Sequence, residues 1–227
     1  MAVVRIIPAG LIGVGSDGNV GAWNNRFGDS SGTMANFGNL GGWTLRALAF
    51  DATGTAWATG MADNVGKWTG QGWENMGNLG GWTLKMVAFG PVSGNNKAGL
   101  WSVGTDGNVG IWRDDTRGWE NRGNLGGWTL DMIAVRPDLA PFSDGSLWCV
   151  GTAGNVGRWN GNGWENKGNL GNWTLRMLML VPGRDPLSDG GMWCVGTGGN
   201  VGRWNGRAWD SMTALRWNYA WISLPGA

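Results

Sequence analysis

Short apolar segments alternate with turns rich in glycine and asparagine along the whole chain. In one unit, residues 82–89 (WTLKMVAF) and 100–105 (LWSVGT) are apolar, and the Asp-Gly pair that follows is a signal for a tight hairpin. Residues 108–112 (NVGIW) and 118–122 (GWENR) supply two further segments. No stretch of useful length follows the period of a helix, and the frequent glycine disfavours one. The pattern predicts four antiparallel strands in each unit.

Two phrases recur along the chain and define these units. The first is Gly-Asn-Leu-Gly-Gly-Trp-Thr-Leu at 38–45, 77–84 and 123–130, with GNLGNWTL at 168–175 and a degraded copy at 213–219. The second, Asn-Val-Gly-x-Trp, stands at 19–23, 64–68, 108–112, 155–159 and 200–204. The second phrase repeats every 44–47 residues, and the first every 44–46 residues after an initial step of 39, which reflects a longer early loop. A four-stranded unit of about 45 residues is typical of a β-propeller blade.

We therefore predict an all-β fold in which residues 1–227 form a single domain, a five-bladed β-propeller of four-stranded antiparallel blades. Both chain ends offer an apolar segment for the incomplete first blade, 3–7 (VVRII) and 217–224 (WNYAWISL). A ring leaves no free sheet edge only when its ends pair. We expect 217–224 to close the ring, with 3–7 lying beside it as an added strand or facing a partner chain.

The composition of the chain argues against nucleic-acid binding and against a membrane-spanning segment. Seventeen basic residues balance sixteen acidic ones without any run of like charge, so the basic surface that nucleic-acid binding requires is missing. No apolar run approaches the ~18 residues of a membrane span, and residues 1–6 do not resemble a secretory signal. Cys149 and Cys194 hold the same place in successive units, where equivalent strands diverge, so we expect free thiols. A cytoplasmic protein, or one exported without a signal peptide, is expected.

Catalysis is not expected from this set of side chains. The chain has no histidine to act as a base or to bind zinc. Its glutamates recur with the repeat, because Glu74, Glu120 and Glu165 all stand in Trp-Glu-Asn, whereas a catalytic pair of carboxylates belongs to one place. We expect no enzyme activity, no metal site and no cofactor.

The 19 tryptophans fall mostly into four sets, according to their place in the unit. The second strand carries Trp57, Trp101, Trp148 and Trp193, and the third ends with Trp23, Trp68, Trp112, Trp159 and Trp204. We expect both of these sets to pack in the core. The fourth strand opens with Trp73, Trp119, Trp164 and Trp209, where we expect burial to be poorest. The first strand is entered through Trp43, Trp82, Trp128, Trp173 and Trp217.

The first phrase links one blade to the next, and its composition suits a sugar. Paired glycines allow positive φ and leave the backbone open to approach. Asparagine adds an acceptor and two donors, and tryptophan adds an indole face and an N–H. The alternative interpretation is a simple blade-crossing turn with a structural tryptophan. The candidate sugar-binding residues are Asn39, Gly42, Trp43, Asn78, Gly81, Trp82, Asn124, Gly127, Trp128, Asn169, Asn172, Trp173, Trp73, Trp119 and Trp164.

The chain resembles the tachylectin-type lectins in its five tandem repeats, in Gly-Gly-Trp before an apolar inner strand, and in a tryptophan-bearing outer strand just upstream. More loosely it is similar to tectonin-type propeller lectins, in segments such as 147–151 (LWCVG) followed by 154–159 (GNVGRW). The resemblance implies one sugar pocket at each blade seam and recognition of N-acetylated or otherwise modified sugars. The chain departs from the pattern at Asn172 and at Thr213, Leu215 and Arg216, so the fourth and fifth sites differ or are lost.

Two function classes remain open. Near-identical phrases favour a lectin, because several linked weak contacts raise avidity about 10²–10⁴-fold over one contact. The alternative is a non-catalytic protein-binding scaffold, for which one distinctive face would suffice. The loops between first and second strands, among them 136–145 and 182–191, vary most and either carry specificity or have drifted. We predict a multivalent carbohydrate-binding protein in defence or glycan recognition, with glycans as partners, as a monomer or small homo-oligomer.

Overall fold

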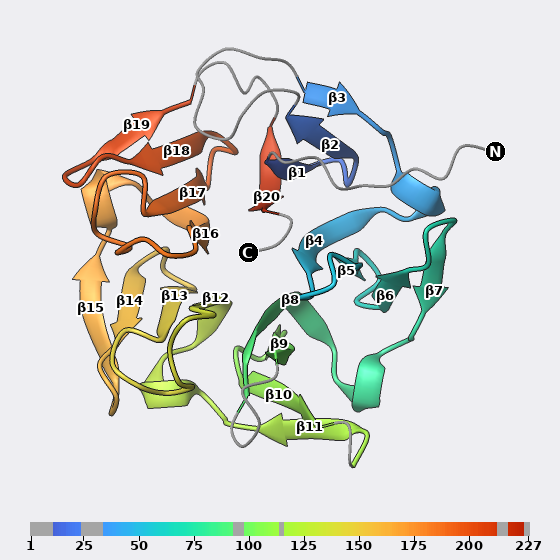
Figure 1. The fold of residues 1–227 in the computed structure, drawn as a ribbon, viewed down its shortest axis with the longest axis horizontal. Coiled ribbons are helices and arrows are strands. Elements are labelled where there is room, and N and C mark those ends of the chain that lie inside the picture. Colours follow the sequence, from blue (N-terminus) through green and yellow to red (C-terminus); the bar gives the residue numbers. More distant parts are fainter. Residues whose placement is uncertain (1–10, 24–33, 93–97, 114–115, 213–217, 225–227) are drawn as a thin grey trace.

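Five four-stranded antiparallel sheets surround a central axis and form a five-bladed β-propeller (Figure 1). The computed structural model describes residues 11–23, 34–92, 98–113, 116–212 and 218–224. In each blade the first strand lies nearest the axis and the fourth lies at the rim (Figure 1). The predicted fold class is therefore confirmed. Within the described ranges, no helix has the length and hydropathy needed to cross a membrane.

The strands of each blade follow one another in sequence, except in the first blade, which begins with the last strand of the chain. The first blade contains β20 (Tyr219–Ser223), β1 (Ile12–Gly15), β2 (Val20–Trp23) and β3 (Met34–Asn36). The second contains β4 (Leu45–Phe50), β5 (Ala56–Gly60), β6 (Val65–Trp68) and β7 (Trp73–Asn75). The third contains β8 (Leu84–Pro91), β9 (Ala98–Gly104), β10 (Val109–Arg113) and β11 (Gly118–Asn121). The fourth contains β12 (Leu130–Val135), β13 (Leu147–Gly151), β14 (Val156–Trp159) and β15 (Trp164–Gly168). The fifth contains β16 (Leu175–Leu180), β17 (Met192–Gly196), β18 (Val201–Trp204) and β19 (Trp209–Ser211).

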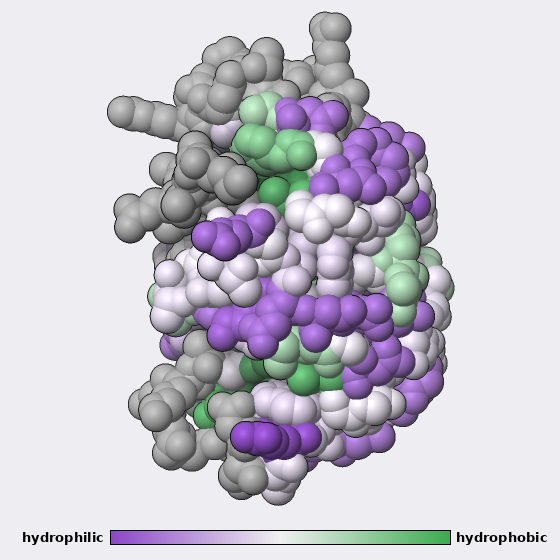
Figure 2. Space-filling view, turned by 90° about the vertical axis from the view of Figure 1, so that its right-hand side faces the viewer, coloured by the Kyte–Doolittle hydropathy of each residue, from purple (hydrophilic) through white to green (hydrophobic). Residues whose placement is uncertain are grey.

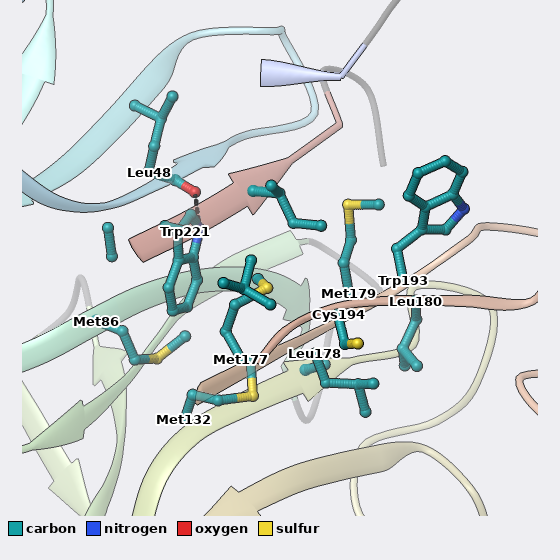
Figure 3. Close-up of a cluster of buried hydrophobic side chains, with 14 of the residues drawn as sticks. Leu48, Met86, Met132, Met177, Leu178, Met179, Leu180, Trp193, Cys194 and Trp221 are labelled. Carbon is teal, nitrogen blue, oxygen red and sulfur yellow. Dashed lines mark hydrogen bonds between the residues drawn. The ribbon is translucent and has the colours of Figure 1, made fainter. Parts of the chain in front are cut away.

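The ring is closed by the two ends of the chain. β20 runs antiparallel to β1, with Ile12 opposite Ser223 and Val14 opposite Trp221. This pairing confirms that the C-terminal segment completes the first blade, while Trp217 and residues 3–7 lie outside the described residues. The closing strand is also tied to the second blade, because the Trp221 indole N–H donates to the Leu48 carbonyl at 2.7 Å (Figure 3).

The inner strands meet through side chains of unequal size. Equivalent positions hold Met86, Met132 and Met177, which gather near the Trp221 ring in Figure 3, while the second blade has Ala47 at this place. All five side chains are buried. Flexible methionines fill irregular gaps, and the small alanine of the second blade stands in the inner strand to which Trp221 is hydrogen-bonded. The three methionines and Trp221 pack around the axis and line the small hollow that remains there.

Most of the tryptophans expected in the core are found there. In the second-strand set Trp101, Trp148 and Trp193 are buried, whereas Trp57 is half-buried and donates its N–H to Asp51 at 3.1 Å. In the third-strand set Trp23, Trp159 and Trp204 are buried, and Trp68 and Trp112 are half-buried. Indole rings thus account for much of the packing between and within the sheets.

Both cysteines carry free, buried thiols, as expected. Burial raises the pKa of the Cys149 and Cys194 thiols well above the ordinary value, against a smaller lowering by a hydrogen bond from the Gly157 and Gly202 backbone. We expect neither thiol to react with iodoacetamide at pH 8 in the native protein, and both to react in denaturant, because the thiolate is the nucleophile. Mass spectrometry measures the labelling, with Ala153→Cys, at an exposed hairpin position, as the reactive control. Native labelling at the rate of this control would contradict the buried position.

Candidate functional site

All four described copies of the first phrase fold into the same short 3₁₀ turn at a blade seam. The turns are η1 (Leu40–Gly42), η2 (Leu79–Gly81), η3 (Leu125–Gly127) and η4 (Leu170–Asn172). The paired glycines are explained by the backbone, since Gly126 has φ 62° and Gly127 has φ 77°, both in the left-handed region. In η4 Asn172 stands in place of the second glycine with φ 61°, a conformation that asparagine tolerates better than most residues. The sequence analysis did not predict the hydrogen bonding of this turn.

The outer-strand tryptophans hold these turns in place. The Trp73 indole N–H donates to the Leu40 carbonyl at 2.8 Å, and equivalent bonds join Trp119 to Leu79, Trp164 to Leu125 and Trp209 to Leu170 at 2.6, 2.5 and 2.7 Å. Each ring also lies beneath its turn, so that a Cβ on Gly171 would come within 2.7 Å of Trp209. The expectation of poor burial for this set is therefore wrong for Trp209, which is buried. The N–H groups of Trp73, Trp119 and Trp164 are already used by the fold, and only their rings remain for a ligand.

The tryptophan that follows each turn rests on a glycine of the third strand. A Cβ at Gly110 would lie 2.9 Å from the Trp82 ring and 3.0 Å from the Trp119 ring. The two rings stack with their centroids 5.8 Å apart. Gly66, Gly157 and Gly202 stand in the same relation to Trp43, Trp128 and Trp173. The indole of each Gly-Asn-Leu-Gly-Gly-Trp phrase thus packs directly against the glycine of the Asn-Val-Gly-x-Trp phrase in the same blade.

The hairpin between the second and third strands of the preceding blade contacts the start of the inner strand that follows the turn. The Leu45 N–H donates to the Gly18 carbonyl at 3.2 Å, and Leu130 and Leu175 donate likewise to Gly107 and Gly154 at 3.4 and 3.3 Å. The phrase therefore crosses the seam between blades, as the sequence predicted. In the hairpin of the second blade, Asp63 takes the place of Gly18, Gly107 and Gly154. Asp63 has φ 62° and forms an ion pair with Arg46 at 2.5 Å.

Several polar groups at each corner remain available. The tryptophans that follow the turns are half-buried, namely Trp43, Trp82, Trp128 and Trp173. Their indole N–H groups donate to no residue that the structure describes. Asn39 is exposed and donates to the Thr44 hydroxyl at 3.2 Å, so its amide oxygen faces no described donor. Beside them, a Cβ on Gly42, Gly81 or Gly127 would meet no atom within 4 Å. We call this arrangement of indole, glycine and asparagine the seam corner.

The seam corner contains almost every candidate sugar-binding residue of the four intact phrases. Asn124 and Asn169 donate to the hydroxyls of Thr129 and Thr174 at 3.4 and 3.5 Å, as Asn39 does to Thr44, and Asn78 is likewise exposed. Asn172 is exposed beside Trp173. The fifth copy, which includes Thr213, Leu215 and Arg216, lies outside the described residues.

The asparagine of each Trp-Glu-Asn triplet stabilises the start of the next turn, which the sequence analysis did not predict. The side-chain oxygens of Asn75, Asn121 and Asn166 accept the N–H of the glycine that opens the next phrase, at 2.7–2.8 Å. Their recurrence two residues before that glycine was the available signal. The glutamates of the third and fourth blades form surface ion pairs, Glu120 with Arg113 and Arg122, and Glu165 with Lys167. The hydrogen bond from Lys167, with a smaller effect of Arg158, holds the pKa of Glu165 below its ordinary value.

One flank of the molecule has a mixed surface. On the flank seen in Figure 2, bands of hydrophilic residues alternate with small apolar patches. Among the residues that the structure describes, no three side chains of the metal-binding types lie close enough together to hold an ion.

Comparison with known proteins adds little to this geometry. No family model and no curated protein matches the chain. Among solved structures, YCF48 bound to D1 peptide gives a TM-score of 0.40 at 13% identity, over 87% of this chain and 62% of that one. BBS1N in complex with ARL6DN gives 0.48 at 11% identity, over 88% and 59%. The WD40 β-propeller domain of Doa1 gives 0.41 at 14% identity, over 93% and 65%.

None of these three descriptions mentions a carbohydrate, and this chain spans 59–65% of the length of those chains. With TM-scores below 0.5, the likenesses carry no argument about function. The fold is established by the sheet topology of the chain itself. The protein is a five-bladed β-propeller, and the residues that the structure describes form a turn of the same geometry at four of its seams.

Proposed function

We propose that the protein is a non-catalytic, multivalent carbohydrate-binding propeller, with one shallow sugar site at each seam corner. One observation carries the proposal. At each of three seams a half-buried indole with an unused N–H stands beside an open glycine and an exposed asparagine, and at the fourth the exposed Asn172 takes the place of that glycine. A purely structural tryptophan usually finds a partner for its N–H, as the outer-strand set does here.

The chemistry of a seam corner suits a neutral sugar. The indole face can cover the C–H face of a pyranose ring, and its N–H can donate to a ring substituent. An N-acetyl group fits this pairing well, because its carbonyl accepts and its N–H donates to the amide oxygen of asparagine. The open glycine lets the ligand approach the backbone without a side chain in the way.

Repetition compensates for the shallowness of each site. A single corner offers few contacts and would bind one sugar weakly. Four corners around one rigid ring would engage a clustered glycan together, with a gain of about 10²–10⁴-fold over a single contact. This gain is available only when the ligand is itself displayed in many copies, as it is on a cell surface.

A glycan array tests the proposal. We expect signal on clustered N-acetylated or methylated sugars, with competition by the free monosaccharide only at much higher concentration. Crystals soaked with the same monosaccharide should show it at several seam corners. An array without signal, or a sugar bound away from every corner, would exclude the seam corners as lectin sites.

A second candidate function, protein binding, is favoured by an apolar hollow on the propeller axis. The hollow measures about 100 Å³ and is lined by residues of all five inner strands, among them Met86, Met132 and Trp221, and by Pro137 and Pro182 of the loops that follow. It is too small for a sugar ring but suits an apolar side chain of a partner. Binding to a protein that is abolished by Pro182→Asp and unaffected by changes at the seam corners would favour this candidate.

A further inference from the structure

A separate cavity lies between the fourth and fifth blades, at the opposite end of β12 from η3. Its volume is about 350 Å³, within the range of ~300–1,000 Å³ that is usual for small-molecule sites. The fourth blade supplies the loop after β12 and side chains of β13, β14 and β15, and the fifth supplies residues 185–187. We call it the interblade cavity. None of the candidate residues of the seam corners lines it.

A buried donor in the wall of the interblade cavity is unpaired. Trp148 lines the cavity with 1% of its surface exposed, and its indole N–H has no partner within the described ranges. Equivalent indoles in the second and third blades are satisfied, because Trp57 donates to Asp51 and Trp101 donates to the Pro91 carbonyl at 3.3 Å. Buried N–H groups are nearly always paired in folded proteins. The Nε1 atom itself is covered by protein atoms, so Trp148 lines the cavity with its ring and not with its N–H.

The charged side chains of the cavity wall balance one another. Three are cationic, Arg136, Arg158 and Lys167, and three are anionic, Asp144, Glu165 and Asp185. Arg158 binds both oxygens of Asp144 at 2.7 Å, and Lys167 binds Glu165 at 2.5 Å. Such pairs hold donors and acceptors side by side at fixed positions. A phosphate or a cation would find no excess of opposite charge, whereas a hydroxyl can donate to a carboxylate and accept from its guanidinium partner.

The remaining wall of the cavity is apolar. Leu139, Pro186 and Leu187 line it together with the Trp148 indole. Six of the eleven lining residues are charged, so the cavity is more polar than the usual site for a small organic ligand. A compound with one C–H face and a rim of hydroxyls matches both parts of this lining.

We propose that the interblade cavity is a second binding site, which takes a neutral polyhydroxyl ligand of about one sugar ring. Hydroxyls of the ligand bridge the Arg158–Asp144 pair, and its C–H face lies against the apolar wall that includes Trp148 and Leu187. The proposal deepens the carbohydrate function and rests on it for the class of ligand, but it uses residues that no seam corner contains. The protein would then hold one saccharide unit in the interblade cavity and others at the seam corners.

Indole N–H resonances of ¹⁵N-labelled full-length protein test this site directly. Trp148→Phe assigns one resonance by its disappearance, and Phe variants at Trp43, Trp82, Trp128 and Trp173 assign those of the corners. The probes are glucose, N-acetylglucosamine and mannose, with inorganic phosphate and glycine as charged probes. We expect a neutral sugar to shift the Trp148 resonance, and phosphate and glycine to leave it unchanged.

Substitutions separate this site from the corners. Leu187→Trp, at a rim position that is 38% exposed, should fill the cavity and abolish the Trp148 shift without touching the core. Arg158→Gln should weaken the sugar about tenfold, the usual effect of one lost hydrogen bond to a charged group. Arg113→Gln, which breaks an ion pair of the third blade outside the cavity, is the matched control and should have no effect.

The outcomes distinguish this proposal from the proposed function. Sugar shifts at the corner resonances without one at Trp148 would overturn the interblade site and leave the lectin proposal standing. A shift at Trp148 alone would support the interblade site and overturn the corners. A Trp148 resonance that responds to phosphate or glycine, or to none of the probes at 50 mM, would overturn the assignment of a neutral polyhydroxyl ligand.

Discussion

Replacing Trp43, Trp82, Trp128 and Trp173 together by phenylalanine should reduce binding to a clustered glycan about 10²–10⁴-fold, because the avidity of four linked sites is lost. Phenylalanine keeps an aromatic face above the third-strand glycine and removes the indole N–H. Since that N–H has no partner among the described residues, its loss leaves no protein group unsatisfied. Surface plasmon resonance on an immobilised glycan that the array identifies measures the binding.

The outer-strand set provides the matched control. Trp73→Phe, Trp119→Phe and Trp164→Phe each remove a donor from the carbonyl of a turn, so each should lower the free energy of unfolding by about 0.5–1.5 kcal/mol. The seam variants should lose binding with a smaller loss of stability per site, and the outer variants should lose stability first. If the two sets lost stability equally and the seam set kept its binding, the tryptophans of the corners would be structural.

Gly110→Val should lower the free energy of unfolding by about 1–3 kcal/mol, the usual cost of added methyl groups in a packed region. The new Cβ would lie 2.9 Å from the Trp82 ring and 3.0 Å from the Trp119 ring, and the Trp119 N–H is held by the Leu79 carbonyl. The rings must therefore move from their positions beneath the turn. Denaturant unfolding, followed by circular dichroism, measures the change.

Gly163→Ala is the control for this substitution. Gly163 has no atom within 4 Å of an added Cβ and does not have a positive φ. Its replacement should change the free energy of unfolding by no more than about 0.5 kcal/mol, as for most open surface positions. Equal stability of the Gly110→Val and Gly163→Ala proteins would show that the Trp82 ring does not rest on the third strand.

The strands could be predicted because their signals are local. The apolar runs and the turn residues of 82–122 place β8, β9, β10 and β11 within two residues at either end. The closing strand followed from counting first strands against blades, since a ring cannot leave an edge open. Both inferences need only the order of residues along the chain.

The geometry of the site could be predicted only in part. Repetition pointed to the glycines and tryptophans of the seam corners, but the 3₁₀ turn depends on a hydrogen bond from Trp73 to Leu40, 33 residues apart in sequence. For the same reason the use of the outer-strand N–H groups was not foreseen. The interblade cavity depends on two loops of different blades, which no local pattern places side by side.

Closure of the ring by β20 has a consequence for synthesis of the protein. β1 leaves the ribosome early, while its partner in the pairing of Ile12 with Ser223 is translated only after the other four blades. Until then the nascent chain exposes an unpaired sheet edge, which is prone to join other chains. At high concentration the strand that fills this edge can come from a neighbouring molecule, which yields exchanged dimers. Chaperones that shield strand edges during translation would therefore raise the yield of closed monomer.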